Sequence, residues 1–257
     1  MKKKLQLILQ FAIRDFKQKY ITTNLGQFWF FLSPIIMISI YTIIFSDIMS
    51  LKLNFTQNDF AYSTYLIPGI LAWTSFSVII SSLTNSFEHK ANLIKKINVP
   101  MYIFQLSTFL VEFMMFLLSI SLAVLFLLIT SNSVTFTFLW MVPIMFLQTV
   151  FAFSLGIILS LFTPFFKDIK VAVPLILKLW FWMTPIVYLK QLIIDRFPAI
   201  LIYNPLYYFI DIYHDIFLYS KAPSFESLLK ITLLSFFTLC IAAYLYKKMI
   251  STIKDIL

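Results

Sequence analysis

Charged residues are rare along this chain, and long, mostly apolar runs separate them. No charged residue lies in 20–46 or in 60–87, and a third uncharged run, 113–166, is 54 residues long. A helix crosses about 30 Å of hydrocarbon with about 20 apolar residues, so the third run is long enough for two crossings. The polar residues of 130–133 lie in its middle, which predicts a helical hairpin.

The apolar runs predict an all-α membrane protein with six transmembrane helices in a single domain, 1–257. Pro100 precedes the third helix, where proline suits the first turn, and Pro164 marks the end of the fourth. The expected spans are 27–49, 62–86, 101–129, 138–163, 171–188 and 228–246.

The segment 190–227, between the fifth and sixth spans, does not have the pattern of a span. Its apolar runs are short, and Pro198, Pro205 and Pro223 interrupt them. Apolar runs of about 10 to 14 residues are typical of interfacial or re-entrant helices, which enter the membrane only partway. We therefore expect short re-entrant helices here.

The segment 4–22, before the first span, is amphipathic. Apolar residues from Leu5 to Phe16 recur at helical spacing, and polar residues such as Gln6 and Arg14 lie between them. This pattern predicts a helix that lies in the membrane interface. The helix is either a simple anchor or a collar that also contacts a partner, and spacing alone does not separate the two.

The segment 88–99, between the second and third spans, combines apolar and basic residues, which favours a short exposed helix. Its charge has two explanations: the lysine excess of a cytoplasmic loop, or a docking surface for a partner. The candidate contact residues are Glu88, Asn92, Leu93, Lys95 and Lys96.

Lysine and arginine set the expected orientation, because cytoplasmic loops carry the excess of both. With the N-terminus inside, fourteen basic residues face the cytoplasm and five face the outside. Both termini are then cytoplasmic, as an even number of spans requires. Topology also accounts for the net charge of +9, so membrane lipids are expected partners and nucleic acid is not.

The composition excludes several classes of function. With 61% hydrophobic and 12% charged residues, the chain has too few polar side chains for a water-soluble globule. The three glycines, Gly26, Gly69 and Gly156, are too far apart to form a phosphate-binding loop, so we do not expect this chain to hydrolyse ATP. One cysteine and two histidines cannot build a zinc site, and we expect no metal, no cofactor and no catalytic residue.

Two ionisable residues lie within predicted spans, where a charge costs a few kcal/mol near the membrane centre. At 1.5 Å per residue, Glu112 lies about 16 Å and Lys178 about 10 Å from the cytoplasmic ends of their helices. Three explanations stay open. The two residues pair with each other, they line a polar pathway, or Lys178 reaches the interface without a partner.

An aromatic run, 180–188, ends the fifth span near the expected outer boundary. Such residues usually form the interfacial belt or pack inside the protein. Trp180 and Tyr188 are about two turns apart, however, and flat aromatic faces also suit sliding contact with sugar rings. The run can therefore either form the interfacial belt and pack inside the protein, or line a pathway for a sugar-containing substrate.

Taken together, these segments resemble the membrane subunit of ABC-2 type exporters, in the branch that carries polysaccharides and polyol phosphates. The likeness covers nearly the whole chain, and it rests on an ordered set of residues. The matching positions are Arg14, Asp15, Tyr20, Leu25, Gly26, Trp29, Pro34, Tyr41, Phe45, Gly69, Trp73, 92–96, Pro100, Gly156, Asp168, Ile169, 184–188 and 204–206.

The resemblance implies a homodimer of six-helix subunits with a separate ABC ATPase, which binds ATP and Mg²⁺. It identifies 88–99 as the coupling segment and 190–227 as gate helices. The implied function is export of a lipid-linked polysaccharide of the O-antigen (lipopolysaccharide) type across the cytoplasmic (inner) membrane, with teichoic acid or capsular polysaccharide as alternatives. A glycan path at the dimer interface would be lined by Tyr41, Trp180, Trp182 and Tyr188.

Two other classes of membrane protein are alternatives. A secondary transporter generally has more intramembrane charge and more glycine-broken helices than this chain. A membrane enzyme of glycolipid metabolism would use clustered acids or histidines, and Asp211, His214 and Asp215 are the close group in this sequence. We expect these three residues to form the polar face of a gate helix instead.

Overall fold

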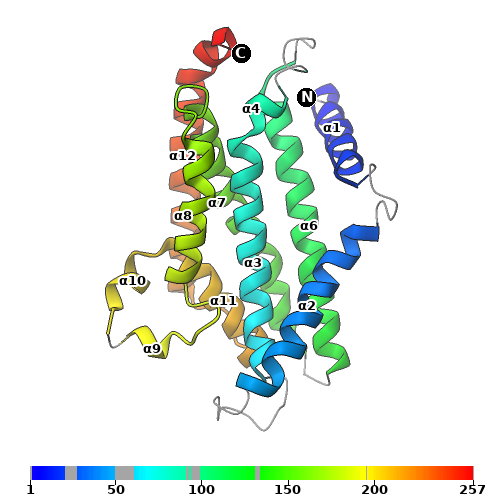
Figure 1. Ribbon diagram of the computed structural model, residues 1–257, viewed down its shortest axis with the longest axis vertical. Coiled ribbons are helices and arrows are strands. Elements are labelled where there is room, and N and C mark those ends of the chain that lie inside the picture. The colour runs from blue at the N-terminus through cyan, green and yellow to red at the C-terminus, as the bar shows by residue number, and fades with distance from the viewer. Residues whose placement is uncertain are drawn as a thin grey trace.

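The computed structural model describes residues 2–20, 28–49, 61–90, 93, 99–130, 134–194 and 196–256. Throughout this part of the chain the regular elements are helices (Figure 1). Four of them are long and apolar enough to cross a membrane. They are α3 (Ala61–Thr84), α6 (Tyr102–Ile129), α7 (Met141–Phe162) with the short 3-10 helix η2 (Phe136–Trp140) before it, and α12 (Phe225–Ile256).

Two further helices coincide with the first and fifth predicted spans. In α2 (Phe28–Met49), the residues Phe31–Ile44 form an apolar helical stretch. The other helix, α8 (Ile169–Met183), has 15 residues, which gives a length of about 22 Å. Because the hydrocarbon core is about 30 Å thick, α8 alone is too short to span it. The six-span arrangement therefore stays a prediction.

The helix α8 ends five residues before the predicted boundary at 188. Thr184 has extended backbone angles, with φ −104° and ψ 128°. The cause is Pro185, because proline lacks an N–H donor and disfavours helical angles in the residue before it. Short helices then follow in the predicted gate segment, namely α9 (Gln191–Ile194), α10 (Pro198–Tyr203) and α11 (Pro205–Tyr219).

Among the other helices, the largest difference between a predicted and an observed helix end is at α12. This helix continues ten residues beyond the predicted end at 246, because lysine and methionine are good helix formers and no proline or glycine follows. The predicted interface helix is α1 (Lys2–Tyr20). Of the predicted coupling segment, the structure describes the end of α4 (Ser86–His89), Lys90, Leu93 and Val99.

Both termini lie at the same end of the molecule, together with α1 and α4 (Figure 1). We call this end the terminal end, and the opposite end the far end. The helix α3 forms the centre of the bundle, and it packs against α6, α7, α8 and α11. Its closest neighbour is α7, where a Cβ atom added to Gly156 would lie 2.8 Å from Leu83 Cβ. Such close approach at a small residue is typical of helix packing in membranes.

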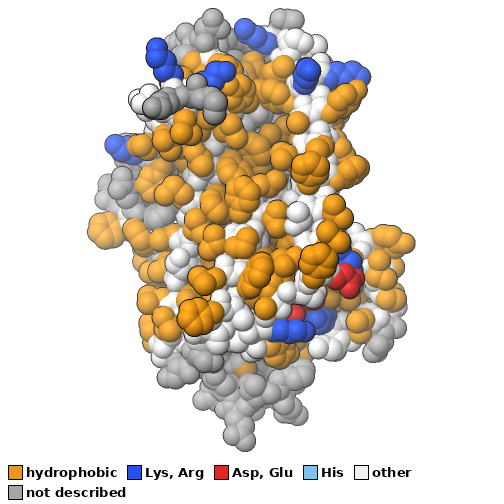
Figure 2. Space-filling view, turned by 180° about the vertical axis from the view of Figure 1, so that it is seen from behind, with side chains coloured by type: hydrophobic (Ala, Val, Ile, Leu, Met, Phe, Trp, Pro, Cys, Tyr) orange, Lys and Arg blue, Asp and Glu red, His pale blue; other side chains and the backbone are white. Residues whose placement is uncertain are grey.

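The outer surface is largely apolar. Figure 2 shows a broad area of hydrophobic side chains, with Lys and Arg side chains at the terminal end and a second group, beside acidic side chains, toward the other end. On α8 and α12 this surface includes Val171, Leu175, Leu179, Leu233, Phe236, Phe237 and Tyr244. An exposed apolar area of this extent indicates contact with lipid or with another protein surface.

Candidate functional site

The side chain of Asn204 holds together the connection between α8 and α11. Its Oδ1 accepts hydrogen bonds from Trp180 Nε1 (2.8 Å) and from the backbone N–H of Leu206 (3.1 Å). Its amide group donates to the carbonyl oxygen of Met183 (3.2 Å) and to Thr184 Oγ1 (2.9 Å). Asn204 is buried and is the N-cap of α11. We call these five residues the Asn204 cluster.

The non-helical segment after α8 is fixed to α3 by two tyrosines. Tyr62 donates its hydroxyl hydrogen to the carbonyl oxygen of Val187 (2.5 Å). Tyr65 lies within hydrogen-bonding distance of the carbonyl oxygens of Tyr188 (2.8 Å) and Pro185 (3.2 Å). Non-helical backbone is tolerated at membrane depth when protein groups satisfy it, so these contacts suit a re-entrant segment.

Trp180, an expected path-lining residue, packs inside the subunit. Its ring meets Phe76 edge-on at 5.2 Å between centroids, and Trp73 at 6.4 Å. Its indole N–H is bonded to Asn204. Packing is therefore the role that the geometry favours for Trp180.

The other expected path-lining residues differ in their surroundings. Trp182 is 64% exposed on α8, and its ring is thus available to a partner or ligand. Tyr188 is half-buried, and its hydroxyl donates to the carbonyl oxygen of Trp182 (2.7 Å). The side chain of Tyr41 lies outside the described residues. Trp182 is consequently the candidate that a passing molecule would meet most directly.

The two intramembrane ionisable residues do not pair with each other. Glu112, on α6, is 7% exposed and lines a cavity of about 210 Å³ that also includes Ser33. Lys178, on α8, is exposed and lines a different cavity, of about 380 Å³. Because Glu112 and Lys178 line different cavities, the structure does not bring them together as a pair, which was one of the three open readings. The position of Glu112 is compatible with a second reading, in which it lines a polar pathway, because hydroxyl side chains such as Ser33 and Ser119 line the same cavity.

Two ion pairs connect α4 to helices on either side of it. Glu88 pairs with Lys170 at the start of α8. Lys90 pairs with Asp15 of α1 at 2.7 Å, and Asp15 also accepts a hydrogen bond from Ser107 of α6 at 3.0 Å. The end of α4 is thereby tied to α8, α1 and α6. A movement of α4 would act on all three helices.

Of the remaining predicted coupling residues, the structure describes Leu93. Leu93 is half-buried and lines a cavity of about 320 Å³ next to α1. Asn92, Lys95 and Lys96 lie outside the described residues. The predicted site residues do not include Asp15 and Lys90. The one available sequence signal is that Asp15 is an acidic residue in an otherwise basic amphipathic helix, which indicates that a lysine or arginine pairs with it.

The acidic and histidine residues of α11 do not form an open catalytic group. Asp211 pairs with Lys190 at 2.6 Å. His214 is buried against Tyr65, with ring centroids 3.9 Å apart, and a Cβ atom on Gly69 would lie 3.0 Å from its Nε2. Among the residues that the structure describes, no three His, Cys, Asp or Glu side chains gather in a way that could hold a metal ion.

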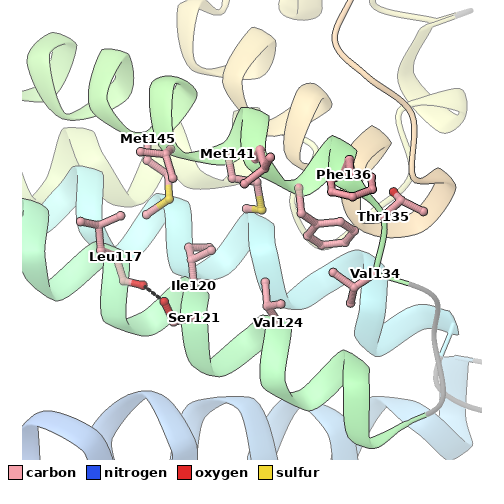
Figure 3. A pocket seen from close by; sticks show the side chains of 12 residues that line it. Leu117, Ile120, Ser121, Val124, Val134, Thr135, Phe136, Met141 and Met145 are labelled. Carbon is pink, nitrogen blue, oxygen red and sulfur yellow. Dashed lines mark hydrogen bonds between the residues drawn. The ribbon is translucent and has the colours of Figure 1, made fainter.

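A separate cavity of about 760 Å³ lies at the far end, between α6 and the η2–α7 connection (Figure 3). Its walls are mainly apolar, with side chains such as Ile120, Val124 and Met145. The hydroxyl of Ser121 points to the carbonyl oxygen of Leu117, to which it donates at 2.8 Å. This cavity offers few groups that could recognise a polar molecule.

The comparisons with known proteins agree on one family. The family described as ABC-2 type transporter matches residues 6–218. Two O-antigen export system permease proteins RfbA of Klebsiella pneumoniae are 30% identical to this chain, one over 82% of the chain and 80% of its own length, the other over 78% and 75%. A protein of the same name from Myxococcus xanthus is 24% identical over 94% of this chain and 91% of its own length. This chain therefore belongs to the ABC-2 type transporter family.

Proposed function

We propose that this chain is the permease subunit of an ABC exporter that moves a lipid-linked polysaccharide of the O-antigen type across the cytoplasmic membrane. The observation that carries the proposal is the similarity to three O-antigen export permeases over 78–94% of the chain. The chain is a membrane subunit of a transporter and not itself an enzyme. ATP hydrolysis is the task of a separate ABC ATPase subunit.

The proposed topology has six spans, with both termini in the cytoplasm. The distribution of basic residues supports this orientation, because lysines of α1, of the α7–α8 turn and of the end of α12 lie at the terminal end. Cytoplasmic loops carry such an excess. In this topology α8 starts at the terminal end and forms the fifth span together with the segment that follows it, whereas α9, α10 and α11 would enter the outer half of the membrane without crossing it.

The proposed working unit is a homodimer with the glycan path between the two copies. In the part of the chain that the structure describes, side chains are closely packed around α3, so a wide passage is better placed between two copies than inside one. The face of α8 exposes Val171, Leu175 and Trp182, so a second copy would cover apolar surface there. Tyr41, Trp182 and Tyr188 are the lining candidates that the packing of Trp180 leaves in place.

The proposed contact with the ATPase is the coupling segment around α4. Leu93 and its charged neighbours Lys95 and Lys96 would meet the ATPase, whereas Glu88 and Lys90 face Lys170 and Asp15 within the subunit. ATP-driven closure of the ATPase would push on α4. The two ion pairs would pass this movement to α8 and to α1.

The proposal is tested by purifying the tagged chain from its own membranes. We expect two copies of the chain to be recovered with two copies of an ABC ATPase, by native mass spectrometry. ATP hydrolysis should occur with the complex and not with the chain alone. Recovery of the chain without an ATPase under several mild detergents, or ATP hydrolysis by the chain alone, would contradict the assignment.

A further inference from the structure

The cavity of about 380 Å³ between α3 and α8 combines a cation with hydroxyl and indole groups. Figure 1 shows the two helices side by side along this part of the molecule. Its lining residues from α3 are Trp73, Ser77 and Ser81, and those from α8 are Pro174, Leu177, Lys178, Phe181 and Trp182. The apolar residues form the walls, and the polar groups and Trp182 can hold a ligand.

Lys178 has no carboxylate partner in the described part of the chain. It lies nine residues after Ile169, which corresponds to about 14 Å along α8. A charged side chain within a membrane helix is costly and normally faces a partner or a water-filled cavity. Glu112, the partner considered in one of the three readings, lines other cavities. An anionic ligand in the α3–α8 cavity would supply the missing opposite charge.

Trp182 lies one helical turn beyond Lys178, about 6 Å further along the axis. Its ring is 64% exposed and lines the same cavity. A large, rigid aromatic face provides contact area at low entropy cost, and sugar rings pack well against such faces. An ammonium group is also a common phosphate-binding group in proteins. The spacing of the two side chains thus fits a phosphate directly bonded to a sugar.

We propose that this cavity is a binding site for a glycosyl phosphate, with the phosphate at Lys178 and the adjacent sugar ring on Trp182. The inference rests on the proposed function and names the part of the lipid-linked glycan that the subunit holds. Leu177 and Phe181 supply apolar wall beside the phosphate position, and the hydroxyl groups of Ser77 and Ser81 line the same cavity.

The site is tested by binding of three synthetic probes to the full chain in phosphatidylcholine nanodiscs. The probes are farnesyl phosphoryl glucose, farnesyl phosphate, which lacks the sugar, and farnesyl glucoside, which lacks the phosphate. Lys178→Gln should weaken both phosphate probes about tenfold, since a charge-assisted hydrogen bond is lost, and leave the glucoside unchanged. Lys178→Arg should stay within about threefold, because it keeps the charge.

Trp182→Leu should weaken the two sugar-containing probes about three- to tenfold and leave farnesyl phosphate unchanged. Trp140→Leu is the matched control, because Trp140 is also an exposed tryptophan but lies in η2, away from the cavity. Wild-type affinity of Lys178→Gln for both phosphate probes would overturn the proposal. An equal loss for all three probes, as a general packing defect would give, would overturn it as well.

A phosphate could also come from the headgroup of an ordinary membrane lipid. Repeating the measurement in phosphatidylglycerol nanodiscs separates the two sources. We expect farnesyl phosphoryl glucose to keep its affinity within about threefold, because the sugar contact adds to the phosphate contact. Loss of probe binding only in phosphatidylglycerol would assign the site to a membrane lipid and overturn the glycan assignment. The binding assay needs no ATPase and is therefore independent of the export assay. If the complex exports glycan but the chain does not bind the probes, the binding site is refuted and the proposed function is not.

Discussion

Replacing Asn204 by alanine tests whether one amide group holds the end of α8 and the start of α11 together. The variant removes both hydrogen bonds that Oδ1 accepts, from Trp180 and Leu206, and both that the amide donates, to Met183 and Thr184. It leaves the indole N–H of Trp180 without its partner. No backbone strain is added, because Asn204 has ordinary extended angles, φ −86° and ψ 104°.

The size of the effect follows from the four hydrogen bonds that are lost. One hydrogen bond contributes on average about 0.6 kcal/mol to the free energy of unfolding of a membrane protein, and about 1 kcal/mol to that of a soluble protein. The expected loss is therefore about 2–4 kcal/mol. Trp180→Phe keeps an aromatic ring and removes one of the four bonds, so it should cost about 0.5–1.5 kcal/mol.

Reversible unfolding in mixed micelles with increasing SDS measures these differences. Asn85→Ala is the matched control, because the Asn85 amide donates a hydrogen bond to the carbonyl oxygen of Ser81 in the last turn of α3 (3.0 Å). It should cost less than about 1 kcal/mol. In a double-mutant cycle, Trp180→Phe and Asn204→Ala should couple by about 0.5–1.5 kcal/mol. A loss below about 0.5 kcal/mol for Asn204→Ala, or no coupling, would refute the structural role of the cluster.

Two further predictions use the same unfolding assay. Gly156→Ala places a Cβ atom 2.8 Å from Leu83 Cβ, so it should destabilise the subunit by about 1–3 kcal/mol. A Cβ atom at 156 would also lie 2.8 Å from Leu83 Cδ1, so adding Leu83→Ala, which removes Cδ1 and keeps Cβ, should recover part of that loss. Full additivity of the two losses would argue against close α3–α7 contact. Asp15→Ala should cost about 1–3 kcal/mol, because it leaves the half-buried Lys90 without its carboxylate. Equal stability of Asp15→Ala and the wild type would exclude a structural role for this ion pair.

The positions of most helices could be predicted from the distribution of charge and proline. The helix α6 lies within one residue of the expected 101–129, because Pro100 and the polar residues 130–133 are local signals. The early end of α8 was also encoded locally, by Pro185. The predicted end at 188 follows the apolar run, which continues past Pro185 and does not itself fix where a helix ends.

The contacts between distant segments could not be predicted in this way. Asp15 and Lys90 are 75 residues apart, and spacing along one helix contains no information about their pairing. The sequence likewise left open whether Glu112 and Lys178 pair, because two helices can both pack on α3 without facing each other. Asn204 did have a local signal, since an asparagine before proline at a helix start is typical of an N-cap, but its bond to Trp180 depends on the fold.

Transport by a reconstituted complex tests the central claim most directly. The chain and its ATPase are placed together in liposomes that contain a fluorescent lipid-linked O-antigen glycan, and movement of the glycan between leaflets is followed by quenching. We predict movement that requires ATP, the ATPase and this chain together. Equal movement without the ATPase, or none with the complete and ATP-hydrolysing complex, would contradict the account of this chain as a permease subunit for O-antigen export.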